Sequence, residues 1–280
     1  METETERAPA LPKLLRNLLY FLRKLLWRVL SVGAIPKHIA FIVDGNRTYA
    51  KKKNLDDEAS YRAAFTALLF ICKYCLELGV KHLTFFAFSI DNFKRTPEQI
   101  KCVMDLILEK TQLLLKEENL VKRYGIRVIF IGNLQLLNEP LRLAAEEAMV
   151  ATAGNSKIII SVCVAYKSSN EIVCAIQKSC KYQLNAESCA LKMPKMRPSN
   201  SIKLVDLQKY LSMSVVPNPN ILIRTSGETR LSDFLLWQTT NCLLYSPAAL
   251  WPEIGLRHLV WAILNYQRLY PYLERKKEQV

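Results

Sequence analysis

Short apolar runs alternate along the chain with segments whose apolar residues recur at helical spacing. The runs are continuous rather than alternating, as expected for parallel strands that are covered on both faces. They predict strands at residues 38–43, 82–88, 127–131, 157–165 and 220–223. The patterns between them predict helices at residues 58–78, 97–122, 139–151 and 170–182. This alternation indicates an α/β fold with an open, mainly parallel β-sheet flanked by helices.

Two later segments do not follow the alternation. Residues 231–267 are predicted to be helical, apart from a short apolar run at 243–245. Residues 183–216 are polar, contain prolines and begin without periodicity, which indicates a mobile insertion with some helix near 204–211. We expect a single domain at residues 35–280 that contains this insertion, preceded by a separate segment at 1–34.

The N-terminal segment begins with ten polar residues, for which we expect disorder, and continues as "LPKLLRNLLYFLRKLLWRVLSVG". Its polar residues recur at helical spacing, namely Lys13, Arg16, Asn17, Arg23, Lys24, Arg28 and Ser31. Charges at nearly every turn argue against a membrane-spanning helix and against a cleaved signal peptide. The pattern favours an amphipathic helix on an anionic membrane surface or a partner. The alternative is a helix that packs on the protein's own apolar surface.

The chain has 280 residues, half of them apolar, and a formal net charge of +14. Such a charge favours anionic partners, which include membranes, phosphorylated substrates and nucleic acids. Nucleic acid is disfavoured, because no tract interleaves basic residues with aromatics or glycines. Cys72 and Cys75 form a CxxC pair inside a helical pattern, without a second pair or nearby histidines. Buried cysteines in a reducing compartment explain them better than zinc does.

Polar residues follow three of the predicted strands, and ligands of open parallel sheets bind beyond the carboxyl ends of the strands. The candidate residues are Asp44, Gly45, Asn46 and Arg47, then Ser89, Asn92 and Arg95, and finally Arg224, Arg230 and Ser232. Each could have an ordinary role in a turn or a helix cap. Together, a carboxylate, several arginines and small hydroxyls favour a site for diphosphates and a divalent cation.

The segments "HIAFIVDGNR", "FAFSIDNFKR", "ILIRTSGETRLSDFLLWQ" and "ALWPEIG" resemble the cis-prenyltransferases in order and spacing. This family contains the undecaprenyl and dehydrodolichyl diphosphate synthases, and the resemblance covers residues 38–266. The chain resembles the eukaryotic dolichol- and rubber-type catalytic subunits more than the bacterial enzymes. The bacterial homodimeric type has a metal-binding glutamate near Leu243, and this chain has none there.

The resemblance implies that isopentenyl diphosphate condenses with an allylic diphosphate, such as farnesyl diphosphate, to give a long-chain polyprenyl diphosphate. It implies that Asp44 holds Mg²⁺ and that the Gly45–Arg47 backbone faces the leaving diphosphate. Asn92, assisted by Arg95, would position the reacting end of the substrate. The resemblance also implies that isopentenyl diphosphate is held by Arg224, Arg230 and Ser232. The product would serve dolichol or rubber-like polyisoprenoid synthesis.

The resemblance also implies a partner and a location. The catalytic subunit would work with a Nogo-B-receptor-like accessory subunit, whose C-terminal tail completes the active site. It would lie peripherally on the cytosolic face of the endoplasmic reticulum membrane. An apolar tunnel for the growing chain could be lined by helix residues that are otherwise ordinary core, namely Phe65, Leu68, Leu69, Ile100, Met104 and Leu108.

Several positions depart from the family pattern. Thr48 stands where the family usually has a second arginine, and Asn220 stands where an aspartate is typical. The family also usually has a cationic residue near the position of Asp57. "SYRAA" replaces a Gly-His-x-x-Gly element and contributes the departures Ser60, Tyr61 and Ala64. Either the allylic site is weakened but rescued by Arg47, Arg62 or the lysines at 51–53, or the chain is a paralogue that binds a partner without turnover. The intact "RTSGETRLS" and Asp44 favour a working enzyme.

Overall fold

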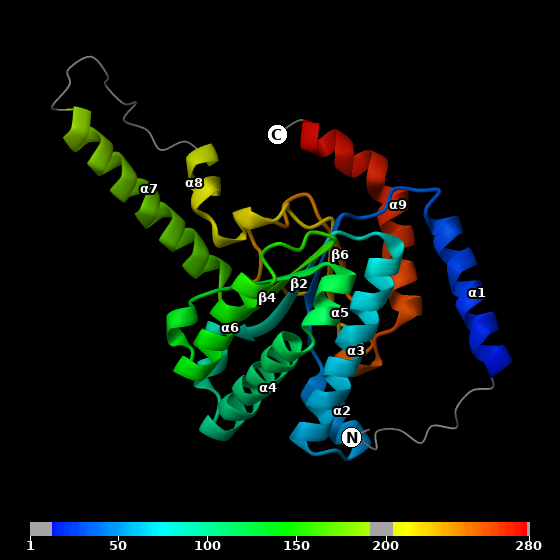
Figure 1. The fold of residues 1–280 in the computed structure, drawn as a ribbon. Helices are drawn as coiled ribbons and strands as arrows, with labels where there is room; N and C mark the ends of the chain where they lie inside the picture. The colour runs from blue at the N-terminus through cyan, green and yellow to red at the C-terminus, as the bar shows by residue number, and fades with distance from the viewer. Residues whose placement is uncertain (1–12, 191–203, 279–280) are drawn as a thin grey trace.

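The computed structural model describes residues 13–190 and 204–278, which form a six-stranded sheet flanked by helices (Figure 1). The strand order is β3-β4-β2-β1-β5-β6, and every neighbouring pair is parallel. The strands are β1 His38–Ile42, β2 His82–Ser89, β3 Ile126–Ile131, β4 Ile158–Tyr166, β5 Ile221–Arg224 and β6 Leu243–Tyr245. The predicted open parallel α/β sheet is therefore confirmed, and the apolar run at 243–245 supplies its edge strand.

The helices begin where the sequence offers capping residues. Asp56, Thr96 and Asn138 accept hydrogen bonds from backbone N–H groups in the first turns of α3, α4 and α6. The α-helices are α1 Lys13–Leu30, α2 Asn46–Lys53, α3 Asp57–Leu78, α4 Pro97–Lys116, α5 Glu118–Tyr124, α6 Glu139–Ala151, α7 Ser168–Ala190, α8 Leu204–Tyr210 and α9 Leu256–Glu278. Four 3₁₀ turns complete the described elements, namely η1 Ile90–Lys94, η2 Leu134–Leu136, η3 Ser212–Val215 and η4 Trp251–Glu253.

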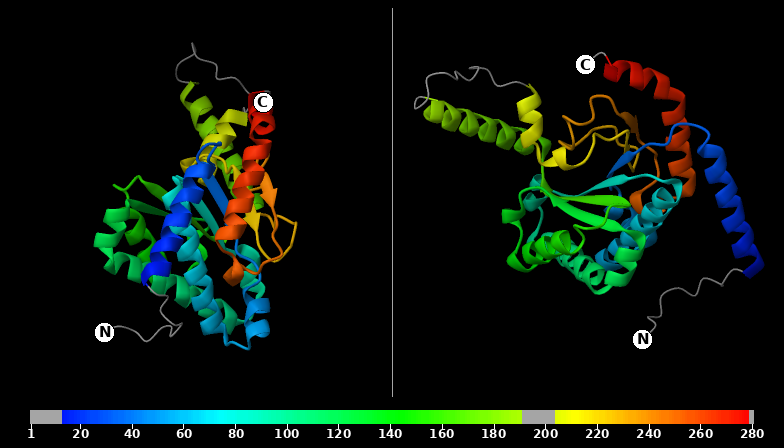
Figure 2. Two further views of the ribbon diagram at one scale, coloured as in Figure 1. Left: turned by 90° about the vertical axis from the view of Figure 1, so that its right-hand side faces the viewer. Right: turned by 45° about the horizontal axis from the view of Figure 1, so that its top comes forward.

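Three predicted segments differ from the structure. Residues 231–255 are not helical but form turns, β6 and η4, because Ser232, Asp233 and Leu235 adopt positive φ angles that an α-helix excludes. The helix predicted at 97–122 is divided at Glu117 into α4 and α5. Helix α7 continues to Ala190, beyond the predicted start of the insertion, and projects with α8 away from the sheet (Figure 2). The expected mobility of this insertion falls largely on residues 191–203, outside the described residues.

Both faces of the sheet are buried, which explains the continuous apolar runs of its strands. On one face, Phe41 and Phe85 stack with ring centroids 5.1 Å apart beneath Trp251, and α3 and α9 cover them. On the other face, Phe86 stacks on Phe234 at 4.4 Å. A third cluster lies between the sheet and helices α4 and α6. This packing fixes the carboxyl ends of the central strands, where the candidate residues lie.

Helix α1 packs on the domain through one end and leaves much of its apolar surface exposed. Trp27 and Leu30 join the core, and Arg23 and the Trp27 indole both donate to the Glu77 carboxylate of α3. Its exposed apolar side chains include Leu15, Leu18, Leu19, Phe21, Leu22, Leu25 and Val29. Both alternatives for this segment therefore find support, because the helix docks on its own domain yet presents a broad apolar face. In the described part of the chain, no helix is long and apolar enough to cross a membrane.

Candidate active site

A cleft of about 610 Å³ opens at the carboxyl edge of the sheet, above the ends of β1, β2 and β5. It is lined by nearly all of the candidates from the sequence, namely Asp44, Gly45, Asn46, Arg47, Ser89, Asn92, Arg95, Arg224 and Ser232. Arg230 is the exception. Its side chain is 64% exposed and pairs with Glu228 at the rim. The strand-end argument therefore brings the candidates to one place.

Asp44, the second residue beyond β1, is held by the backbone and by a neighbouring strand. Its N–H donates to Thr225 Oγ1 at 2.9 Å, and the same hydroxyl lies 2.6 Å from the Asp44 carbonyl oxygen. One carboxylate oxygen accepts from the Gly45 N–H at 2.8 Å and the other from Arg224 Nη2 at 2.6 Å. The side chain is still 36% exposed, so its remaining lone pairs face the cleft.

Arg224 organises the β5 side of the cleft. The residue is only 4% exposed, and its Nη1 donates to the Arg230 carbonyl at 2.5 Å and to Ser232 Oγ at 2.6 Å. With Nη2 bonded to Asp44, one buried guanidinium thus fixes the carboxylate, the loop and the hydroxyl together. Ser232 has a φ of 51°, an uncommon value for a residue with a side chain, which these contacts help to hold.

Gly45 allows helix α2 to begin directly against the cleft. Its φ is 102°, and a β-carbon there would lie 2.9 Å from the Leu250 side chain, so only glycine fits without strain. No side chain caps the helix at this residue. The N–H groups of the first turn of α2 are therefore open toward the cleft, an arrangement suited to an anion.

The β2 side supplies a second cation and an amide. The Asn92 carboxamide oxygen accepts from the Ser89 N–H at 3.1 Å, and the Ser89 hydroxyl accepts from the Asp91 N–H, which builds η1. Burial lowers the pKa of Arg95, the nearby positive charge of Arg47 lowers it further, and Asp44 opposes both effects. Among the described residues, neither Arg47 nor Arg95 has a carboxylate at ion-pair distance. Two guanidinium groups thus line the cleft near each other, and no described carboxylate forms an ion pair with either of them.

The departures from the family pattern fall into two groups. Thr48 and Tyr61 line the cleft, so these changes lie in the candidate site. Ser60 is buried and donates to the Asn46 carbonyl at 3.0 Å, while the Ala64 carbonyl accepts from the Trp251 indole at 2.9 Å. These two positions therefore join α3 to α2 and η4.

Asn220, a further departure, lies at the opposite edge of the sheet from the cleft. Asn220 precedes β5 at the amino edge of the sheet, where its carboxamide oxygen accepts from the N–H groups of Lys37 and His38. Its change from aspartate therefore does not alter the charge of the cleft. Asp57 is the first residue of α3.

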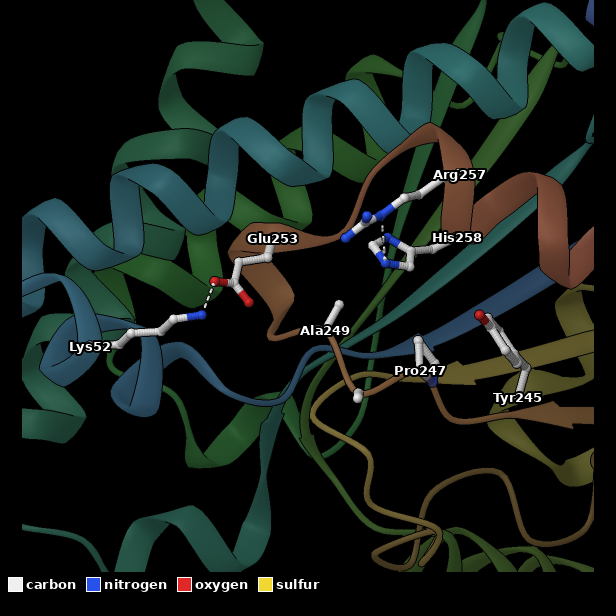
Figure 3. A pocket seen from close by; sticks show the side chains of 8 residues that line it. Lys52, Tyr245, Pro247, Ala249, Glu253, Arg257 and His258 are labelled. Carbon is white, nitrogen blue, oxygen red and sulfur yellow. Dashed lines mark hydrogen bonds and ion pairs between the residues drawn. The ribbon is translucent and has the colours of Figure 1, made fainter.

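Of the cations expected to rescue a weakened allylic site, only Arg47 lines the cleft. Arg62 pairs with Glu58 along α3 at 2.8 Å, and its side chain is 58% exposed. Lys52 pairs with Glu253 at 2.7 Å in a separate cavity of about 660 Å³, where Arg257 also contacts His258 (Figure 3). These cations are therefore directed away from the cleft.

A magnesium ion fits the donor set of the cleft if phosphate oxygens share it. Mg²⁺ usually takes one or two protein carboxylates together with substrate phosphates. Asp44 provides one carboxylate with free lone pairs, and no group of three histidine, cysteine, aspartate or glutamate side chains able to hold a metal occurs within residues 13–190 and 204–278. Cys72 and Cys75 lie within α3 as free thiols, and burial raises the pKa of both.

The residues expected to line a tunnel have mixed positions. Met104 is buried in the cluster under α4, and Ile100 and Leu108 pack against it. Leu69 is 52% exposed on α3. None of the six lines the cleft of the described residues, although Val103 of the same helix does.

Sequence reasoning missed Lys167 and Asp233, which lie at the same edge of the sheet. Lys167 directly follows β4, so the strand-end argument would have found it had it been applied to that strand. Asp233 directly follows Ser232, but the predicted helix over this segment concealed the loop that carries it.

The fold and the cleft are typical of α/β proteins that bind phosphorylated ligands at the carboxyl edge of a parallel sheet. Residues 42–271 match the family described as "Putative undecaprenyl diphosphate synthase". The chain belongs to this family, the cis-prenyltransferases, as its motifs predict.

Similar proteins align over nearly the whole chain. It is 53% identical to dehydrodolichyl diphosphate synthase 6 of Arabidopsis thaliana, with 96% of this chain and 95% of the relative covered. It is 50% identical to rubber cis-polyprenyltransferase HRT2 of Hevea brasiliensis, with coverages of 95% and 96%. It is 38% identical to the dehydrodolichyl diphosphate synthase complex subunit DHDDS of Homo sapiens, with coverages of 89% and 72%.

A solved structure shares the fold. The crystal structure of lavandulyl diphosphate synthase from Lavandula x intermedia, in complex with dimethylallyl diphosphate, superposes with a TM-score of 0.71 at 27% identity. The match covers 83% of this chain and 95% of that chain. The parallel sheet and its helical layers are therefore those of a diphosphate synthase.

Proposed function

We propose that this chain catalyses cis-prenyl chain elongation, in which isopentenyl diphosphate condenses with an allylic diphosphate such as farnesyl diphosphate. C4 of isopentenyl diphosphate forms a bond to C1 of the allylic substrate, whose C1–O bond breaks as diphosphate leaves. A proton is lost from C2 of the isopentenyl unit, and a cis double bond forms. Repetition gives a long-chain polyprenyl diphosphate of the dehydrodolichyl or rubber type.

The observation that carries the proposal is the charge pattern of the cleft. Arg47 and Arg95 face the cleft without a carboxylate partner among the described residues, beside the open N-terminus of α2. Backbone N–H groups and guanidinium groups are the usual ligands of phosphate oxygens. These groups, with Gly45 and Asn46, would bind the allylic diphosphate.

The β5 side would bind isopentenyl diphosphate. Ser232 and the exposed Arg230 supply a hydroxyl and a cation, and Arg224 holds both of them and Asp44 in place. Ser89 and Asn92 would position the reacting ends from η1. Because both substrates must meet in one geometry, most of the catalysis is orientation and charge stabilisation. Asp44 would hold Mg²⁺, which would neutralise charge on the leaving diphosphate.

An accessory subunit and a membrane surface complete the proposal. The human relative is named as a subunit of a synthase complex, which supports a Nogo-B-receptor-like partner for this chain. The exposed leucines and Phe21 of α1 support peripheral binding to the cytosolic face of the endoplasmic reticulum membrane. An apolar product also requires an apolar acceptor phase, which such a membrane provides.

A second candidate function is that of a non-catalytic subunit. Thr48 and Tyr61 line the cleft where the family has an arginine and a histidine, so the allylic side has less positive charge than usual. Such a chain would still fold and bind a partner. The working enzyme is favoured by Asp44, Arg224 and Ser232, which match the family pattern and are joined by hydrogen bonds.

The test is co-expression of the full chain with a Nogo-B-receptor-like subunit, followed by assay of the purified complex with Mg²⁺, farnesyl diphosphate and radiolabelled isopentenyl diphosphate. We expect long-chain product that disappears when Mg²⁺ is chelated. A complex that co-purifies but incorporates no label would contradict the proposal and support the non-catalytic subunit.

A further inference from the structure

Two carboxylates flank the cleft from opposite loops. Asp91 belongs to η1, which follows β2, and Asp233 belongs to the loop that follows β5. Both line the cleft. Each directly neighbours a proposed substrate residue in the sequence, because Asn92 follows Asp91 and Ser232 precedes Asp233. A contact that fixes the distance between the two carboxylates therefore also fixes the distance between the loops that carry Asn92 and Ser232.

Lys167 bridges these carboxylates. Its Nζ lies 2.9 Å from Asp91 Oδ2 and 3.5 Å from Asp233 Oδ2. The lysine side chain is 25% exposed, so most of its length is enclosed. The hydrogen bond to Asp91 raises the pKa of Lys167, and Asp233 raises it further. Lys167 thus remains charged while it holds the loops of β2 and β5 together.

The Asp233 end of the bridge is anchored firmly to the first residues of α7. The Ser168 N–H donates to the Asp233 carbonyl at 2.8 Å. The Ser169 N–H and hydroxyl donate to the two oxygens of its carboxylate at 2.9 and 2.5 Å. The following residue, Phe234, stacks on Phe86 of β2. A fixed Asp233 gives Lys167 a rigid base from which to hold η1.

The Asp91 end depends on lysines. Its other oxygen accepts from Lys94 at 2.9 Å within η1, and the Lys94 side chain is 83% exposed. That contact closes a local turn and does not connect the two loops. Lys167 alone of these two lysines therefore links η1 to the β5 loop.

We propose that Lys167 is a positioning residue, which fixes Asn92 relative to Ser232 so that the two substrates meet in reacting geometry. This inference rests on the proposed condensation, because it concerns the alignment of two bound diphosphates. A misplacement of about 1 Å in such a reaction can cost on the order of 10²-fold in rate. The effect of losing Lys167 should therefore appear in kcat, while each substrate still binds.

The experiment compares Lys167→Met with Lys94→Met in the co-expressed complex. Both variants remove one lysine charge that contacts Asp91, but only the first breaks the bridge to Asp233. Lys167→Met should lower kcat by roughly tenfold or more while both KM values stay within about threefold. Lys94→Met should keep all three parameters within about twofold. Lys167→Arg, which preserves the charge and the bridge, should restore most of kcat.

A double-mutant cycle with Asp91→Asn tests whether Lys167 acts through its contact with Asp91. If the bridge sets the geometry, the double variant Lys167→Met/Asp91→Asn loses no more kcat than Lys167→Met alone. Additive losses would contradict the inference. A rise in KM that vanishes at high salt, with kcat unchanged, would also overturn it, since Lys167 would then only neutralise the carboxylates. The wild-type complex is assayed first, so that a failure of the proposed condensation is distinguished from a failure of the inference about Lys167.

Discussion

The two sides of the cleft are built differently. On the β5 side, the guanidinium of Arg224 is buried and bonds Asp44, the Arg230 carbonyl and Ser232. On the β1 side, Arg47 and Thr48 are exposed at the start of α2. The described residues give Arg47 no carboxylate partner. One side is thus fixed by internal hydrogen bonds, and the other is open.

This difference explains where the sequence departs from the family pattern. A change on the β5 side would leave a buried guanidinium without its partners, which is costly. Thr48 and Tyr61 line the cleft outside the hydrogen-bond network of Arg224, so a change there should alter ligand affinity more than folding. The cleft-lining departures accordingly lie on the open side.

Asp44 connects the two sides, and its replacement should give the largest effect. Asp44→Asn keeps an oxygen for Arg224 but loses the charge that would bind Mg²⁺. We expect incorporation of isopentenyl diphosphate to fall by roughly 10²-fold or more. The measurement is the radiolabel assay in the co-expressed complex, with Glu253→Gln as a control that removes a carboxylate from the separate cavity.

Asp44 also contributes to folding, which the sequence alone did not indicate. A strand-end carboxylate appears free in the sequence, yet in the structure it is the partner of buried Arg224. Asp44→Ala should therefore lower the free energy of unfolding by about 1–3 kcal/mol, more than Asp44→Asn does. Wild-type turnover in Asp44→Asn would contradict the assignment of the carboxylate.

The sequence predicted the sheet well because its signal is local. Each central strand is a continuous apolar run, and the strand ends follow directly. The loop at 231–242 was predicted wrongly as helix, because its apolar residues Phe234 and Leu235 pack into the core cluster beside β1 and β2 instead of forming a helical face. Glu171 accepts hydrogen bonds from Tyr166, from the Met213 N–H and from Gln238, contacts that join residues far apart in the chain.

The sequence predicted which residues lie in the candidate site, but not which of them bond to one another. Strand ends of a parallel sheet converge, so Asp44, Asn92 and Ser232 could be expected in one cleft. Arg224 faces inward and Arg230 faces outward. These orientations depend on a turn with positive φ angles at Ser226 and Ser232. No periodic pattern encodes such a turn.

The amino edge of the sheet provides a second contrast, because it holds a buried histidine instead of an open cleft. The His38 ring is fully buried, with Nδ1 2.6 Å from the Pro217 carbonyl and Nε2 2.8 Å from the Thr84 hydroxyl. Burial lowers the pKa of His38 to about 4 from its ordinary 6.5, because the charged ring loses its hydration. The folded protein therefore prefers the neutral ring.

Stability should fall as this edge is acidified. Because the folded pKa is lowered, the contribution of His38 is complete above pH 6.5 and is lost as the pH falls toward 4. Between pH 7 and pH 5 the free energy of unfolding should decrease by roughly 2 kcal/mol from this group. Urea denaturation at each pH measures the loss, and His38→Gln should remove most of the slope. An unchanged slope in that variant would show that other groups cause it.

The smallest effect should come from restoring charge to the open side of the cleft. Thr48→Arg with Tyr61→His reinstates the family residues at two cleft-lining positions. Because water screens exposed charges, the gain in allylic binding should be less than about 1.4 kcal/mol, or tenfold in KM, and larger at low salt. The KM for isopentenyl diphosphate should change little, since Arg224, Arg230 and Ser232 are untouched. Substrate titrations measure both constants, and Thr66→Arg on the exposed face of α3 controls for added charge alone. Equal KM values for the allylic substrate in wild type and double variant would contradict this expectation. Arg47 and Arg95 would then already balance the charge of the allylic diphosphate, and the open side would depart from the family pattern without losing affinity.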